Sequence, residues 1–225
     1  MLINEKDKKT IQSLLGEHLR NPVKLVLFTQ KVSNIAQPFV QPCHWCQETE
    51  SLLEEVASLS EKLHLEKWDF TLDEEKTREY RIDKIPAIVL VGKEDLGIRY
   101  YGIPAGYEFS SLIEDIIDVS REETKLSTET KEKLKKVHKD IHLQVFVTPT
   151  CPYCPPAVRL AHQMALENKH IRADMVEASE FPHFVQKYGV RGVPRTVINE
   201  TISFEGAVPE SIFLDAVLKA AGVEL

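Results

Sequence analysis

The stretch VFVTPTCPYC, residues 145–154, joins a short β-branched run to two cysteines that are separated by two residues. A run of this kind predicts a strand, and a cysteine pair directly after it predicts thiols at the junction of a strand and a helix. Such pairs occur as redox disulfides, as halves of zinc sites and as inert thiols. The features that surround this stretch distinguish these three interpretations.

A second pair, Cys43 and Cys46, lies 108 residues upstream. Pro86 follows Cys43 by 43 positions, and Pro194 follows Cys151 by the same number. Each proline precedes a short β-branched run, and a similar run stands ahead of each cysteine pair. Because the pairs and the prolines share one spacing, we interpret the chain as a tandem duplication.

The duplication predicts two domains, residues 1–121 with the motif CHWC and residues 122–225 with the motif CPYC. In each, the patterns predict the order helix, strand, C-x-x-C helix, strand, helix, strand, strand, helix. We therefore expect an α/β fold with two tandem domains, each a four-stranded mixed sheet flanked by helices.

Composition excludes several classes of protein. The net charge of −7 argues against a general nucleic-acid binder, which usually carries a basic face. No stretch approaches the roughly 18 apolar residues of a membrane span. Residues 1–7 become charged at once and lack the apolar core of a signal peptide. We expect a cytoplasmic protein with neither nucleic acid nor membrane as a partner.

The spacing of each pair suits thiol–disulfide exchange. A thiol reacts as the thiolate, and the first turn of a helix favours an anion through its free N–H groups and its dipole. We expect Cys43 and Cys151 at that position, as nucleophiles. Cys46 and Cys154 follow one turn later and can close an intramolecular disulfide, so we expect them to resolve a mixed disulfide.

The distant prolines complete the prediction of the sites. A proline at the start of a strand can carry a cis peptide bond. At Ile85-Pro86 and Val193-Pro194 such a bond would expose backbone beside the thiols, where an extended substrate segment can pair by strand addition. These four residues are the candidate substrate-binding positions.

An acidic residue recurs at one offset. Asp69 lies 26 residues after Cys43, and Glu177 lies 26 residues after Cys151. One hypothesis is that these carboxylates assist proton transfer for the buried second cysteine of each pair. The alternative is a solvated carboxylate at the end of a strand, and the sequence favours neither.

A zinc site fits the pattern poorly. Zinc sites usually combine two pairs roughly 15–20 residues apart, or a pair with histidines. Here Cys46 and Cys151 are 105 residues apart, and the eight histidines show no ligand pattern. A purely structural disulfide also fits poorly, because so short a loop constrains the unfolded chain little. We expect no metal and no cofactor.

The motif Cys151-Pro152-Tyr153-Cys154 after a strand resembles glutaredoxin. A C-x-x-C helix combined with a hydrophobic residue and a proline at the start of a strand, as at Val193-Pro194, resembles the general signature of the thioredoxin fold, so the resemblance implies two tandem thioredoxin-like domains. Two such units in tandem resemble the protein disulfide oxidoreductases of thermophilic archaea and bacteria over essentially the whole chain. The resemblance implies a protein disulfide oxidoreductase that oxidises, reduces and isomerises protein disulfides in the cytoplasm. Thioredoxin carries a buried acid on the strand before the C-x-x-C helix, and this chain has apolar residues there.

Two alternatives remain open. The first is a dedicated electron carrier between a thioredoxin-reductase-like flavoprotein and a peroxide reductase, which resembles the tandem module of alkyl hydroperoxide reductase flavoproteins. That module typically keeps one working pair, whereas both pairs are intact here. The second alternative is a metal- or cluster-binding scaffold. The expected partners are proteins with thiols or disulfides and a flavoprotein reductase.

Overall fold

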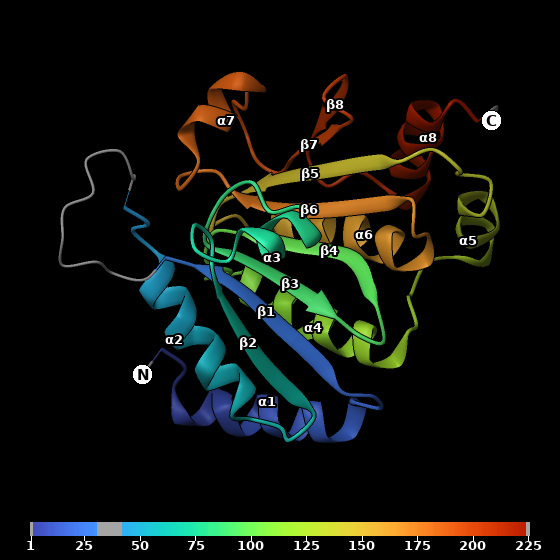
Figure 1. Ribbon diagram of the computed structural model, residues 1–225. Helices are drawn as coiled ribbons and strands as arrows, with labels where there is room; N and C mark the ends of the chain where they lie inside the picture. The colour runs from blue at the N-terminus through green and yellow to red at the C-terminus, as the bar shows by residue number, and fades with distance from the viewer. Residues whose placement is uncertain (1, 31–41, 224–225) are drawn as a thin grey trace.

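The helices and strands follow each other in the order predicted for both halves. The computed structural model describes residues 2–30 and 42–223 (Figure 1). The first half contains α1 (Glu5–His18), β1 (Val23–Thr29), α2 (Cys46–Ala57), β2 (Leu63–Asp69), α3 (Glu74–Glu79), β3 (Ala87–Val91), β4 (Asp95–Tyr101) and α4 (Glu108–Arg121). The second contains α5 (Thr128–Leu134), β5 (Ile141–Val147), α6 (Cys154–Glu167), β6 (Ile171–Glu177), α7 (Pro182–Lys187), β7 (Arg195–Ile198), β8 (Ile202–Glu205) and α8 (Glu210–Ala221).

The four strands predicted for each half join into one eight-stranded mixed sheet. Its order is β2-β1-β3-β4-β6-β5-β7-β8. In the first half β1 pairs parallel with β2 and antiparallel with β3, which pairs antiparallel with β4. The second half repeats this arrangement. The boundary between residues 121 and 122 stays a prediction.

The halves meet where β4 pairs parallel with β6, with Ile98 opposite Ala173 and Tyr101 opposite Val176. β4 is the fourth strand of its half, whereas β6 is the second strand of its half. The two halves therefore join head to tail, through edges that do not correspond in the repeat. This asymmetry gives the two cysteine pairs different neighbours.

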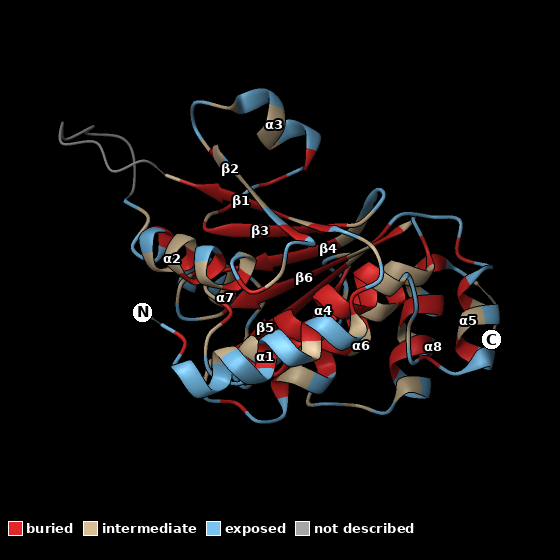
Figure 2. Cartoon of the chain, turned by 90° about the horizontal axis from the view of Figure 1, so that it is seen from below, coloured by how far each residue is buried: buried red, intermediate tan, exposed pale blue. Residues whose placement is uncertain are grey.

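Side chains alternate across the sheet, as the period of a strand requires. Leu25 and Leu27 of β1 contribute to the core cluster shared with α1, α2, α4, α5, α6 and α8. Val26 and Phe28 contribute to the cluster on the opposite face, which includes the residues around α3 and α7. Figure 2 shows the buried strands between the helices of the two faces, and the exposed outer side of α1. Within residues 2–30 and 42–223, no helix is long and apolar enough to cross a membrane.

A buried polar network joins α4 of the first half to α6 of the second. Arg159 forms ion pairs with Asp115 and Asp118, and the Tyr100 hydroxyl donates to Asp115. His162 Nδ1 lies 2.6 Å from Asp115 Oδ2. Burial, together with the charge of Arg159, lowers the pKa of His162 to about 3. The interface between the two halves is thus held by hydrogen bonds and ion pairs as well as by apolar packing.

Candidate redox centres

Both cysteine pairs lie where a strand is followed by a helix, but the helices begin later than expected. Helix α2 begins at Cys46 and α6 begins at Cys154. Cys43 and Cys151 therefore lie in the turn that precedes each helix, and the expectation that they occupy its first turn is wrong. In the second half the Cys154 N–H donates to the Cys151 carbonyl at 3.3 Å, which closes this turn. The second cysteine, not the first, is at the helix N-terminus.

The first pair forms a disulfide between Cys43 and Cys46, with the Cα atoms 5.5 Å apart. Cys46 is buried, whereas Cys43 is partly exposed. The Cys43 N–H donates to Gln30 Oε1 at 2.8 Å, so the end of β1 holds the turn in place. Trp45, between the cysteines, is largely exposed. A reactant can therefore reach Cys43 more readily than Cys46.

The second pair, Cys151 and Cys154, consists of two free thiols. Cys151 is 9% exposed and Cys154 is fully buried. The Cys151 thiol donates to the Val193 carbonyl oxygen, with the sulfur 3.6 Å away. The structure thus brings together a predicted nucleophile and a predicted substrate-binding residue that are 42 positions apart in the chain. Tyr153 is exposed beside them.

The peptide bonds Ile85-Pro86 and Val193-Pro194 are both cis. The carbonyl of Pro86 accepts a hydrogen bond from the Gly102 N–H at 2.9 Å, and the carbonyl of Pro194 accepts one from the Gly206 N–H at 2.8 Å. Each proline segment is thus anchored to the end of the next strand in the same way. The geometric match between the halves extends from the cysteine turn to the proline segment.

The buried thiol of Cys154 has an unusual electrostatic environment. Burial raises the pKa of Cys154 far above its ordinary value, and a hydrogen bond with Cys151 and the charge of Glu108 act in the same direction. A hydrogen bond with the Thr148 backbone lowers the pKa, with an effect smaller than that of burial but larger than that of the Glu108 charge. Such a thiol needs a nearby base before it can react as a thiolate.

Glu108 is a carboxyl group whose charge acts on the Cys154 thiol and which the sequence did not reveal as a candidate. It is the first residue of α4 in the other half and is 1% exposed. Burial raises its pKa to about 7, and the Ser111 hydroxyl offsets only part of this. Acidic residues are common in the first turn of a helix. No local signal therefore marked this glutamate as one whose charge acts on a thiol of the other half.

The first half also contributes backbone to the second centre. The Tyr107 N–H donates to the Pro149 carbonyl at 3.0 Å, two residues before Cys151. Gly106 adopts a positive φ of 59°, and a Cβ at this position would overlap with the Pro149 oxygen. Glycine is required here by close approach and by conformation. The CPYC turn is therefore supported by the segment that leads into α4.

Asp69 and Glu177 are buried at the ends of β2 and β6. Asp69 Oδ1 accepts hydrogen bonds from the Thr71 and Leu72 N–H groups, at 2.9 Å each. Glu177 accepts from the Ser179 hydroxyl and, at 2.8 Å, from the Glu180 N–H. These bonds close the turns that follow the strands. The proton-transfer role of both residues stays a hypothesis.

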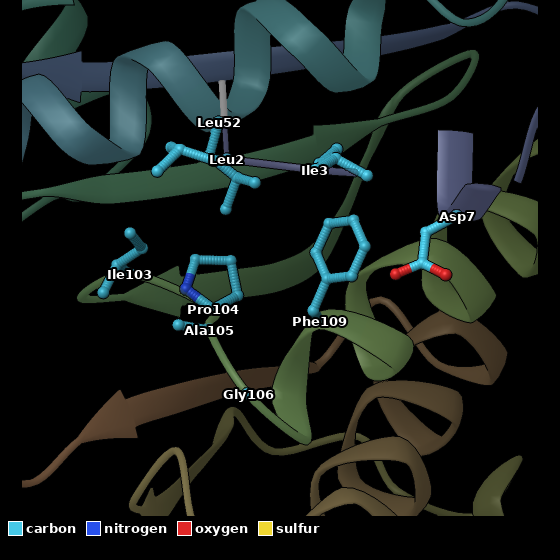
Figure 3. Close-up of a pocket in the computed structure, with 9 residues that line it drawn as sticks. All are labelled: Leu2, Ile3, Asp7, Leu52, Ile103, Pro104, Ala105, Gly106 and Phe109. Carbon is cyan, nitrogen blue, oxygen red and sulfur yellow. The ribbon is translucent and has the colours of Figure 1, made fainter. Parts of the chain in front are cut away.

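An apolar pocket of about 240 Å³ lies between the N-terminal segment, α2 and α4 (Figure 3). Its lining residues are Leu2, Ile3, Asp7, Leu52, Ile103, Pro104, Ala105, Gly106 and Phe109. None of them is a cysteine, so the pocket does not mark the redox chemistry. Across residues 2–30 and 42–223, no group of three or more His, Cys, Asp or Glu side chains is arranged to hold a metal.

Comparisons with known proteins agree with this geometry. A family model described as "Thioredoxin domain" matches residues 141–219. The crystal structure of a protein disulfide oxidoreductase from Aeropyrum pernix K1 is 33% identical, with a TM-score of 0.87, over 99% of this chain and 96% of that one. The chain belongs to the protein disulfide oxidoreductase family. This family assignment covers both halves, because the similarity extends across the whole chain.

The chain is also similar to alkyl hydroperoxide reductase proteins. The structure of the alkylhydroperoxide reductase AhpF from Enterococcus faecalis V583, in a mutant form, has a TM-score of 0.86 at 26% identity, over 96% of this chain and 100% of that one. A Bacillus subtilis strain 168 protein named NADH dehydrogenase is 26% identical over 149 residues. That match covers 66% of this chain and 27% of the relative. The chain therefore corresponds to only part of such relatives.

Proposed function

We propose that this protein catalyses thiol–disulfide exchange on protein substrates, at two centres formed by Cys43 with Cys46 and by Cys151 with Cys154. The observation that carries the proposal is the second centre. There the Cys151 sulfur lies 3.6 Å from the carbonyl oxygen of Val193, which precedes a cis-proline, and the buried Cys154 follows one turn later. A nucleophile, a resolving thiol and a backbone edge for the substrate are thus combined in one place.

In the first step, the Cys151 thiolate attacks one sulfur of a substrate disulfide. The substrate S–S bond breaks, a mixed disulfide forms, and the first substrate sulfur leaves as a thiolate that takes up a proton. The Val193 backbone offers an edge along which an extended substrate segment pairs by strand addition. The proline that follows has no N–H to compete for the substrate carbonyls.

In the second step, Cys154 loses its proton and attacks the Cys151 sulfur. The mixed disulfide breaks, and the second substrate sulfur leaves as a thiolate and is protonated. Two electrons have then passed to the substrate, and the Cys151–Cys154 disulfide has formed. We assign Glu108 as the base that accepts the Cys154 proton, since its pKa near 7 allows it to bind and release a proton at neutral pH. The reverse sequence oxidises a dithiol substrate.

The same chemistry applies to the first centre, where Cys43 is the more exposed cysteine. Isomerisation of protein disulfides is a further activity that two exchange centres in one chain allow. A cytoplasmic location stays a prediction. Which centre has the higher redox potential depends on their side-chain environments, and these differ between the halves.

The experiment that tests the proposal is reduction of insulin by the dithiothreitol-treated protein, together with trapping. The Cys154→Ser variant, in a chain that also carries Cys43→Ser and Cys46→Ser, should accumulate a mixed disulfide through Cys151. Mass spectrometry of a tryptic digest locates the bond. Absence of insulin reduction by the wild-type protein, and absence of an adduct at Cys151, would reject the proposal.

A second candidate function is electron transfer from a flavoprotein reductase to a peroxide-reducing partner. The similarity to the alkylhydroperoxide reductase AhpF over almost the whole chain favours it. This candidate predicts that exchange is efficient only with one reductase and one acceptor protein, and slow with insulin. Reduction of insulin and of unrelated protein disulfides at comparable rates would favour the general oxidoreductase.

A further inference from the structure

Lys84 is a buried lysine directly ahead of the Ile85-Pro86 segment of the first centre. Its side chain is only 5% exposed. The ammonium Nζ lies 2.6 Å from Asp83 Oδ1. It also lies 3.7 Å from the centre of the Tyr101 ring and 4.7 Å from the centre of the Phe184 ring. A cation at these distances from two aromatic rings is held by cation–π attraction.

The two rings connect this lysine to both halves of the molecule. Tyr101 ends β4 of the first half, and its hydroxyl accepts a hydrogen bond from Arg172 Nη2 of the second half at 2.7 Å. Phe184 belongs to α7 of the second half. We call the Tyr101 and Phe184 rings around the Lys84 ammonium the aromatic cage. The second half therefore supplies the Phe184 ring of this cage and, through Arg172, positions the Tyr101 ring.

The backbone near the lysine is anchored at the same place. The Pro86 carbonyl accepts from the Gly102 N–H, directly after Tyr101. The next residue, Ile103, donates its N–H to Glu180 Oε1 of the second half at 2.7 Å. The proline segment of the first centre is thus fixed to the end of β4, and the end of β4 is fixed to the second half.

The second centre has no lysine at the matching position. Its position that matches Lys84 is Gly192, ahead of Val193-Pro194. A Cβ built on Gly192 would meet only Glu205 Oε2, at 3.8 Å. Stability of the fold alone does not require a lysine at this point of the repeat, because the same turn forms around a glycine.

We propose that Lys84 is a positioning residue for the first redox centre: through its cage of Tyr101 and Phe184, the second half holds the Ile85-Pro86 segment where a protein substrate pairs. This inference rests on the proposed exchange function. It assigns no chemical step to Lys84, which acts only by fixing the segment that binds substrate. A purely structural lysine would affect both centres alike, whereas a positioning lysine affects the first centre alone.

The test uses two proteins that each keep one centre: C151S/C154S keeps the first, and C43S/C46S keeps the second. Lys84→Met is introduced into both, and kcat and KM are measured for insulin reduction. In the protein with the first centre, kcat/KM should fall about tenfold, mainly through KM, while reduction of the Cys43–Cys46 disulfide by dithiothreitol changes less than twofold. In the protein with the second centre, insulin reduction should change less than twofold.

Two variants complete the design. Lys84→Arg keeps a cation that stacks on aromatic rings, so it should restore kcat/KM to within about threefold. Lys187→Met removes a lysine of the same helix as Phe184 that also lies over a ring, that of Tyr188, but is half-exposed and pairs with Glu200. It should leave both centres unchanged, and it controls for loss of a surface charge.

Each outcome has a defined meaning. The inference would be overturned if Lys84→Met lowered kcat/KM for insulin equally at the two centres, or lowered it at neither. It would also be overturned if reduction of the Cys43–Cys46 disulfide by dithiothreitol slowed by the same factor as insulin reduction. Each of these results would leave the exchange function intact. Thermal melting of each variant separates a folding defect from a positioning defect, and Phe184→Leu, which removes one ring from the opposite half, should reproduce part of the loss. If the C151S/C154S parent itself fails to reduce insulin, the proposed function of the first centre fails, and the inference fails with it.

Discussion

The two cysteine pairs occupy the same position in their halves, yet each meets a different part of the other half. The second centre receives Glu108, and the backbone of Gly106 and Tyr107, from the first half. At the first centre, the ammonium group of Lys84, directly ahead of the proline segment, lies over the Phe184 ring of the second half. The cause is the pairing of β4 with β6, which joins edges that do not correspond in the repeat.

The fate of the matched glutamates illustrates this difference. Glu210 begins α8 as Glu108 begins α4. Glu210 accepts hydrogen bonds from the backbone and hydroxyl of Ser127 and from the Thr130 hydroxyl, which lower its pKa. Glu108 is instead buried near a thiol, with its pKa raised. A duplicated sequence therefore does not produce duplicated sites when the copies join asymmetrically.

The largest expected effect concerns the nucleophiles. In a chain that carries Cys43→Ser and Cys46→Ser, replacing Cys151 by serine should lower insulin reduction by about a hundredfold or more, because the hydroxyl is a far poorer nucleophile at neutral pH. The single variant Cys151→Ser in the intact chain should keep the activity of the first centre. Residual activity of the triple variant close to that of its parent would contradict the assignment.

The next effect is a change in stability with pH. The pKa of Glu108 is about 7 in the folded protein and about 4.5 in the unfolded chain, so the folded state holds this proton more tightly. Stability is therefore lost as the pH rises from 4.5 to 7, by about 3 kcal/mol in total. Glu108→Gln removes this loss and should be more stable than wild type at about pH 8, but equally stable at about pH 4, by urea denaturation. A difference that does not depend on pH would contradict the assigned pKa.

A smaller effect on stability is expected from alanine substitutions at Gly106 and Gly189. Gly106→Ala should destabilise the fold by about 2 kcal/mol or more, since the Cβ meets the Pro149 oxygen and φ is positive, and it should slow the second centre more than the first. Gly189→Ala is the matched control, with the same φ of 59° and open space around the Cβ. Gly189→Ala should lower the free energy of unfolding by only about 1 kcal/mol and should leave the exchange rates of both centres unchanged. Equal costs for the two substitutions would show that the contact with the CPYC turn is unimportant.

The smallest effect is expected at the recurring acids. Glu177 accepts hydrogen bonds within the turn after β6, so Glu177→Gln should change the exchange rate of the second centre by less than about threefold at any pH between about 6 and 9. Stopped-flow measurement of insulin reduction by the C43S/C46S protein provides the rate. A shifted pH profile for this variant would instead support the hypothesis that the acid takes part in proton transfer.

The pattern of each half was accessible from the sequence because it is local. Each signal extends over only a few residues: the strand runs such as residues 145–147, the cysteine pairs and the two prolines. The equal spacing from Cys43 to Pro86 and from Cys151 to Pro194 then showed that these signals belong to a repeat. The start of helix α6 was less accessible. Pro155 and Pro156 fit its first turn, where N–H groups have no partner within the helix.

The contacts between the halves could not be inferred in the same way. Glu108 looks like an ordinary acid at a helix start, and Lys84 looks like a charged loop residue exposed to water. Their burial depends on which edge of each sheet pairs, and the choice of β4 and β6 follows from packing along the whole seam rather than from a pattern in either strand. The residues that distinguish the two centres are therefore the ones hardest to read from sequence.

The sharpest difference that we propose between the centres is that the second one uses an acid from the first half as its base. It is measured most directly by the pH dependence of insulin reduction by the C43S/C46S protein with Glu108, with Glu108→Gln and with Glu210→Gln. We expect a step near pH 7 that is lost, with a rate about 10- to 100-fold lower, only in Glu108→Gln. Identical profiles for all three proteins would show that Glu108 takes no part in the exchange.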